Sequence, residues 1–93
     1  MIITNGDNTT TFLGREKPIY MQITEIIETD ILKGVLLENG RAPSVSKLAK
    51  SCTVNQATVS KGIDILVKKG ILYKKRGIGI FVQTGAKEII KKE

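Results

Sequence analysis

Residues 43–66, PSVSKLAKSCTVNQATVSKGIDIL, contain the pattern that decides the fold. Ser44 and Asn55 each precede a run whose apolar residues recur every three or four positions, so both are expected to act as helix N-caps. The first run is short and stops near Cys52, and Thr53-Val54 separates it from the second. The stretch therefore predicts two helices joined by a tight turn.

The flanking sequence predicts one helix before this pair and a β-hairpin after it. From Pro18 to Gly34 the apolar residues form one stripe opposite a polar, acidic face, which is typical of an amphipathic helix. Residues 71–82 contain two β-rich runs around a Gly-x-Gly turn, which is typical of a hairpin. The expected fold class is α+β, mainly helical: a winged helix-turn-helix of three helices with a C-terminal β-hairpin wing.

These elements divide the 93 residues into one domain with two short ends. Residues 1–16 show no helical or strand period and are expected to form a flexible N-terminal arm. Residues 17–84 are expected to form the winged helix-turn-helix domain. Residues 85–93 are expected to be a short helical tail, which is too short to be a stable helix in isolation.

Composition argues against several classes of function. The chain has no histidine and one cysteine, so it offers no Cys/His zinc site, no intrachain disulfide and no histidine general base. A domain of this size also encloses little volume for a substrate pocket. We therefore expect no enzyme activity, no cofactor and no metal. The lack of a long apolar run and of a leader pattern predicts no membrane partner and a cytoplasmic location.

Charge is distributed unevenly along the chain. Residues 1–40 carry three basic and six acidic side chains, a net charge of −3, whereas residues 41–93 carry twelve basic and three acidic ones, a net charge of +9. This asymmetry indicates a polyanionic partner for the second half, although a solvated surface is an equally good interpretation of the lysine-rich tail. Arg41 is expected either to contact a phosphate or to pair with Glu38.

The second helix of a helix-turn-helix enters the major groove of duplex DNA, and its N-terminal residues contact the bases. Residues 54–66 are therefore the expected reading segment, and the wing at residues 71–82 is expected to touch the DNA again. Glutamine pairs with adenine, and alanine or the threonine methyl group contacts the thymine methyl group. The base-edge candidates are Gln56, Ala57, Thr58 and Ser60.

Phosphate contacts are expected from hydroxyl and basic side chains around this segment. The free N–H groups of the helix that follows Ser44 suit a phosphate oxygen. Asn55 is expected to add a phosphate contact to its cap, and Arg76 at the wing tip to enter the minor groove. Turn geometry explains Gly77 better than direct binding does, and for any single lysine a solvated surface charge is an equally good interpretation. The phosphate and wing candidates are Ser44, Ser46, Lys47, Asn55, Lys61, Lys74, Lys75, Arg76 and Gly77.

Residues 17–82 resemble the DNA-binding domain of the GntR family of bacterial transcription regulators, with unbroken spacing. The opening Pro-Ile-Tyr and the Val-Asn…Thr-Val-Ser-Lys run are most similar to the small YtrA-like branch. The residues that carry the resemblance are Pro18-Ile19-Tyr20, Gln22-Ile23, Ile31-Leu32, Gly34, Asn39-Gly40-Arg41, Pro43-Ser44-Val45, Leu48-Ala49, Val54-Asn55, Thr58-Val59-Ser60-Lys61, Ile65-Leu66, Gly70-Ile71-Leu72 and Arg76-Gly77-x-Gly79-x-Phe81-Val82.

The resemblance implies a regulator, most often a repressor, that binds a roughly palindromic operator in double-stranded DNA as a homodimer. In the YtrA-like branch a short C-terminal helical segment forms the dimer. Residues 85–93 are therefore expected either to be a truncated form of that segment or to share reduced dimer contacts with the N-terminal arm. Much of the family has arginine where this chain has Ser46, Gln56 and Ser60, so the operator sequence does not carry over, and any small-molecule effector is unknown.

The alternative function is a winged-helix module that binds protein, because a fold does not determine its function. Such a module would present apolar side chains on its third helix. The polar start of that helix and the net charge of +9 on residues 41–93 both favour DNA.

Overall fold

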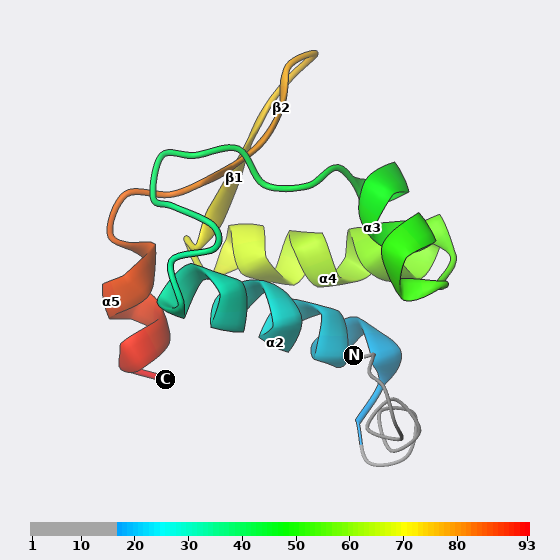
Figure 1. Cartoon of the computed structure of the whole chain (residues 1–93), viewed down its shortest axis with the longest axis horizontal. Helices are drawn as coiled ribbons and strands as arrows, with labels where there is room; N and C mark the ends of the chain where they lie inside the picture. Colours follow the sequence, from blue (N-terminus) through cyan, green and yellow to red (C-terminus); the bar gives the residue numbers. More distant parts are fainter. Residues whose placement is uncertain (1–16) are drawn as a thin grey trace.

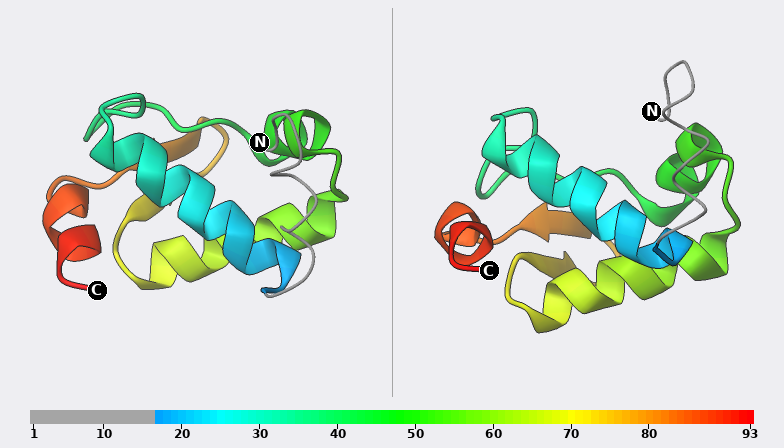
Figure 2. Two further views of the ribbon diagram at one scale, coloured as in Figure 1. Left: turned by 60° about the horizontal axis from the view of Figure 1, so that its bottom comes forward. Right: turned by 90° about the horizontal axis from the view of Figure 1, so that it is seen from below.

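The computed structural model describes residues 17–93, and the expected N-terminal arm at residues 1–16 lies outside the described residues. The elements follow in the order α2 (Ile19–Leu32), α3 (Val45–Cys52), α4 (Gln56–Lys68), β1 (Leu72–Lys75), β2 (Gly79–Val82) and α5 (Ala86–Lys91). Helices α2 and α4 pack against each other, α3 lies across the N-terminal end of α4, and the hairpin extends from the other end (Figures 1 and 2). The predicted three helices and hairpin are confirmed.

The helix-turn-helix is closed by the local signals that the sequence predicts. Ser44 Oγ accepts the Lys47 N–H at 3.1 Å, and Asn55 Oδ1 accepts the Thr58 N–H at 2.9 Å, so both N-caps are confirmed. Between the helices Thr53 takes the left-handed conformation, with φ 55° and ψ 49°. This conformation costs a residue with a side chain about 1–2 kcal/mol, but it turns the chain directly from α3 into α4.

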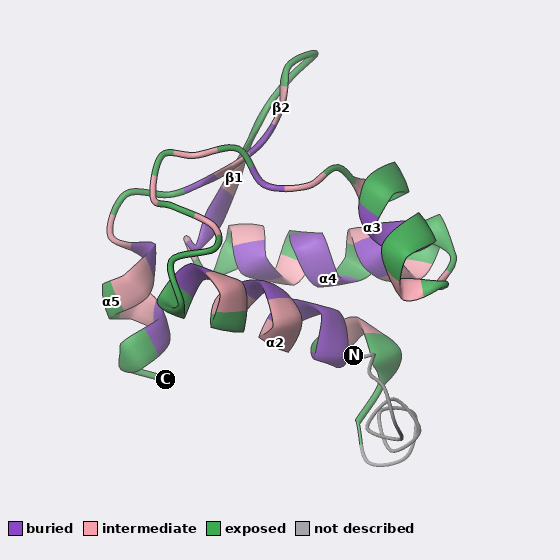
Figure 3. Cartoon of the chain, in the orientation of Figure 1, coloured by how far each residue is buried: buried purple, intermediate pink, exposed green. Residues whose placement is uncertain are grey.

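One apolar core holds all these elements. The inner faces of α2 and α4 supply six of its fifteen buried residues, and α3, both strands, α5 and the segments beside them supply the rest (Figure 3). A fully buried aliphatic side chain contributes about 1.5–3 kcal/mol to the free energy of unfolding. The core therefore provides most of the stability of this small domain. The largest side chains that are less than 2% exposed or at that limit are Ile23, Ile27, Ile31, Val59, Ile63, Leu66, Ile71, Leu72 and Val82.

Gly62 lets α4 approach the backbone of α2. A Cβ atom at this position would lie 2.9 Å from the Tyr20 carbonyl oxygen and 3.2 Å from Cγ2 of Ile23. The first of these atoms belongs to the backbone of a packed helix, so it cannot move aside as the end of a flexible side chain can. Gly62 therefore sets the distance between the two central helices.

The wing is wider than the hairpin that the sequence predicts, because residues 39–42 pair with the outer edge of β2. The Asn39 N–H donates to the Val82 carbonyl oxygen at 2.8 Å, and the Ala42 N–H donates to that of Ile80 at 2.8 Å. A two-stranded hairpin alone is only marginally stable in water. This third segment therefore fixes the base of the wing to the chain that leads into α3.

Helix α5 packs into the same core, against α2, with Ala86 fully buried and Ile90 9% exposed. The Glu38 carboxylate accepts the Gly85 N–H and the Lys87 N–H, both at 3.1 Å, at the start of this helix. These two backbone hydrogen bonds hold the pKa of the Glu38 carboxyl below its usual value. The pairing of Glu38 with Arg41, which the sequence left open, is wrong: the ion pairs among residues 17–93 do not include it, and the Arg41 guanidinium group binds the Ile78 carbonyl oxygen instead.

Replacing Gly62 with alanine tests the close approach of α2 and α4. Helix propensity alone favours alanine by about 1 kcal/mol, whereas overpacking of a tight contact costs about 1–3 kcal/mol. Because the contact is with backbone, we expect G62A to lower the free energy of unfolding, measured by urea denaturation. Ser51→Ala, on the exposed face of α3, is the control and should change little. A G62A variant as stable as the parent protein would contradict this account of the helix crossing.

The Glu38 contact predicts a specific dependence of stability on pH. A carboxyl whose pKa is lowered on folding stabilises the protein above its unfolded pKa, and this stabilisation is lost as the pH falls through the folded pKa. Glu38→Gln should therefore lower the melting temperature at pH 7, and the difference from the parent should shrink below about pH 4.5. Glu88→Gln, at an exposed position of α5, is the control. If Glu38→Gln lowers the melting temperature equally at pH 7 and pH 3, the negative charge of Glu38 does not stabilise the protein.

Candidate nucleic-acid interface

The structure places the predicted contact residues in three groups. The wing and α3 stand on the same side of α4, and α2 covers the other side (Figures 1 and 2). Every candidate is exposed except Thr58 and Ser60, which are half-buried. The groups are Ser44, Ser46 and Lys47 at the start of α3; Asn55, Gln56, Ala57, Thr58, Ser60 and Lys61 at the start of α4; and Lys75 at the end of β1 with Arg76 and Gly77 in the turn of the wing.

The four base-edge candidates on α4 do not all share one surface. With 3.6 residues per turn, Ala57 points directly away from the buried stripe, and Gln56 and Ser60 lie together on one flank. Thr58 lies on the opposite flank, one turn before Gly62, which packs against α2. Gln56, Ala57 and Ser60 therefore form one continuous surface at the start of α4, and Thr58 lies outside it.

Two of the lysines that the sequence singles out have a partner on a helix to which they do not themselves belong. Lys61 Nζ lies 4.1 Å from the ring centroid of Tyr20, a cation–π contact between α4 and α2. Lys74 Nζ lies 2.8 Å from Asp64 Oδ1, which joins β1 to α4 by an exposed ion pair. Neither partner was predicted, because each pair joins elements whose relative positions local sequence patterns do not reveal. A count of basic residues in the sequence is therefore larger than the number of basic side chains that are free to bind an anion.

The wing presents a stiff base and an open turn. The rings of Tyr73 and Phe81 stack with centroids 5.6 Å apart, and Lys75 Nζ lies 5.4 Å from the Phe81 centroid. At the tip Gly77 has φ +76° and nothing within 4 Å of the position a Cβ would take. Turn geometry therefore accounts for this glycine, and Arg76 beside it is exposed to solvent on the projecting tip.

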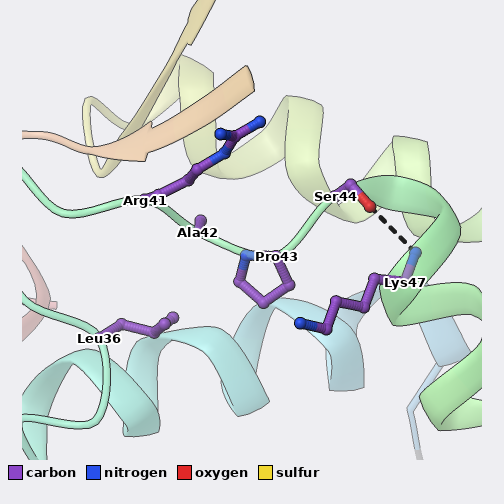
Figure 4. Close-up of a pocket in the computed structure, with 6 residues that line it drawn as sticks. All are labelled: Leu36, Arg41, Ala42, Pro43, Ser44 and Lys47. Atoms are coloured by element: carbon purple, nitrogen blue, oxygen red, sulfur yellow. Dashed lines mark hydrogen bonds between the residues drawn. The ribbon is translucent and has the colours of Figure 1, made fainter. Parts of the chain in front are cut away.

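The start of α3 borders an open hollow between this helix and the segment at residues 39–42. Its volume is about 480 Å³, and Lys47 lies along Pro43 at its edge (Figure 4). Ser44 Oγ already accepts a hydrogen bond as the cap, so towards an anion it acts through its hydroxyl proton and the unpaired N–H groups of the first turn. The hollow is lined by Leu36, Arg41, Ala42, Pro43, Ser44 and Lys47.

Other kinds of site have little support in the described part of the chain. Among residues 17–93 no three histidine, cysteine or carboxylate side chains lie close enough together to hold a metal ion. Across the same residues, no helix has the length and apolar character needed to cross a membrane. Cys52 packs half-buried against the core, and burial raises the pKa of its thiol, which lowers its reactivity at neutral pH.

Three helices, a tight turn between the last two of them and a basic hairpin that follows the third define a winged helix-turn-helix domain. Residues 19–82 match the bacterial regulatory proteins of the gntR family. The chain belongs to this family. Its membership confirms the predicted fold and the predicted family, a family of bacterial regulatory proteins.

Individual relatives agree with this assignment. The HTH-type transcriptional repressor YtrA of Bacillus subtilis is 37% identical over 70 residues, which cover 75% of this chain and 54% of YtrA. A GntR-family transcriptional regulator from Bacteroides thetaiotaomicron superimposes with a TM-score of 0.71 at 43% identity, covering 81% of this chain and 64% of that one. The DNA-binding domain of AraR, in complex with operator ORR3, superimposes with a TM-score of 0.68 at 35% identity, covering 70% and 78%.

The chain is short beside several of its relatives. It spans 54% of the length of YtrA and between 15% and 29% of three other curated regulators. The shared part is in every case no more than 71 residues long. The likeness therefore concerns the winged domain and not the remaining parts of these longer proteins.

Proposed function

We propose that this chain binds duplex DNA sequence-specifically and acts as a transcriptional repressor. The observation that carries the proposal is the continuous solvent-facing surface of Gln56, Ala57 and half-buried Ser60 at the start of α4, with the basic turn of the wing on the same side. Two relatives support it: the domain of AraR whose structure was determined with an operator, and YtrA, which is a transcriptional repressor. A cytoplasmic location follows from a partner that is chromosomal DNA.

In this proposal the start of α4 lies in the major groove. The Gln56 amide pairs with adenine and the Ala57 methyl group contacts a thymine methyl group, whereas the Ser60 hydroxyl discriminates little between bases. Thr58 and Lys61 lie on the flank next to α2, where they contact the sugar-phosphate backbone of the DNA at the edge of the groove. Asn55 combines its cap with a phosphate contact.

The remaining candidates bind the backbone on either side of that groove. The start of α3 offers the hydroxyl groups of Ser44 and Ser46 and the ammonium group of Lys47 to one phosphate strand. The turn of the wing offers Lys75 to the other strand, and Arg76, next to Gly77, enters the minor groove. Contacts of this kind hold the protein in register, and α4 supplies the sequence information.

The division of labour between α4 and the wing is measurable. Gln56→Ala should weaken binding to the preferred operator by about 1–3 kcal/mol and relax preference at one base pair, with an unchanged salt dependence. Lys75→Ala should weaken binding to all sequences alike and reduce the slope of log K against log salt by about 0.9. Fluorescence anisotropy at several salt concentrations, on an operator selected from random DNA, measures both.

Lys91→Ala, on α5, removes the same charge away from the wing and is the control for Lys75→Ala. It should leave binding almost unchanged. If Lys91→Ala weakens binding as much as Lys75→Ala does, charge acts without a defined wing contact. If Gln56→Ala leaves base preference intact, α4 is not the reading helix.

We also propose that two copies bind one palindromic operator, with half-sites one helical turn apart, about 34–36 Å. Sedimentation or native mass spectrometry of the complex should then find two chains on an operator with two half-sites. Inserting about five base pairs between the half-sites turns one copy to the far side of the duplex and should abolish cooperative binding. A single chain on the intact operator, or cooperativity that survives the insertion, would refute the dimer.

A further inference from the structure

We propose that Arg41 is a positioning residue that fixes the direction of the wing tip, so that it affects DNA binding through residues 75–79. The proposal rests on the DNA-binding function proposed above. It adds a role for a side chain that belongs to neither the helix-turn-helix nor the hairpin.

Arg41 spans the wing from its base to its turn. Its backbone lies opposite Phe81 in the segment that pairs with β2. Its side chain extends towards the tip, where Nη2 donates a hydrogen bond to the Ile78 carbonyl oxygen at 2.5 Å. A Cβ on Gly79 would lie 2.9 Å from Nη2 and 3.0 Å from Nε, so the guanidinium group packs directly on the Gly79 backbone.

The turn of the wing has little other support. Within it, the Ile78 N–H donates to the Lys75 carbonyl oxygen at 2.9 Å, and the Ile78 side chain is 57% exposed. Of the side-chain hydrogen bonds in the described part of the chain, only that from Arg41 reaches residues 75–79. The ion pair of Lys74 with Asp64 holds the base of β1, and exposed pairs of this kind stabilise weakly.

Arginine is suited to this task in a way that lysine is not. Its guanidinium group is a rigid planar fork of five donors, so one N–H can bind the Ile78 carbonyl oxygen while the plane lies against Gly79. Arg41 also lines the hollow that Lys47 borders (Figure 4). The competing interpretation is that Arg41 is one more independent cation that contacts a DNA phosphate.

The first test needs no DNA. Backbone ¹⁵N relaxation should show rigid amides at Ile78 and Gly79, with order parameters near about 0.85 in the parent protein and below about 0.6 in Arg41→Ala. Lys47→Ala removes a cation from the same hollow and should leave these amides rigid. Arg41→Lys keeps the charge without the fork and should restore only part of the order. Unchanged order in Arg41→Ala overturns the proposal.

The second test is a double-mutant cycle with Arg76→Ala, measured as affinity for the selected operator. Loss of one exposed hydrogen bond predicts about a twofold to tenfold weaker complex for Arg41→Ala. A displaced tip no longer holds Arg76 against the DNA. We therefore expect Arg76→Ala to lower the affinity by less than about twofold in the Arg41→Ala background, whereas the effects of two independent contacts would multiply.

The outcomes separate the two proposals. Multiplying effects, together with a salt slope reduced by about 0.9 in Arg41→Ala and restored in Arg41→Lys, would show a direct phosphate contact and overturn the positioning role. A parent protein that binds no duplex DNA even at low salt would overturn the DNA-binding function. The relaxation measurement would still decide whether Arg41 orders the wing.

Discussion

The contact between α2 and α4 is the constraint on which the rest of the structure depends. The stripe of Val59, Ile63 and Leu66 on α4 is fully buried, and Gly62 beside it brings the backbones together. Once this stripe is fixed against α2, helical geometry directs Ala57 to solvent. The surface that α4 can offer a partner is therefore decided by the apolar face on its other side.

The wing depends on the same core at one end and on polar contacts at the other. Leu72 and Val82 are buried at its base, whereas residues 74–78 are exposed. Burial of two aliphatic side chains contributes several kcal/mol, about 1.5–3 each, and an exposed hydrogen bond contributes about 0.5–1.5. The base is accordingly firm, and the direction of the tip is the property of the wing that small changes can alter.

Local signals in the sequence predict the elements because each of them acts over a few residues. The caps at Ser44 and Asn55, the apolar periods and the Gly-x-Gly turn all lie within one helix or one hairpin. The pairing of residues 39–42 with β2 could not be predicted in this way, because no short motif marks a segment that joins the edge of a hairpin. The same holds for the contact of Glu38 with the start of α5 and for that of Lys61 with Tyr20. The apolar period of a helix shows which face is buried but not which element covers that face.

These unforeseen contacts also change how the charge of the chain should be counted. The basic half carries +9 in sequence, but Lys74 pairs with Asp64, and Lys69 lies between Glu28 and Glu93. Within residues 17–93 Lys47, Lys75 and Arg76 form no ion pair, and they lie on the side of α3 and the wing. Each phosphate neutralised by such a side chain adds about 0.9 to the salt slope of DNA binding. The geometry therefore implies a slope set by a few cations on one face and not by the net charge of the chain.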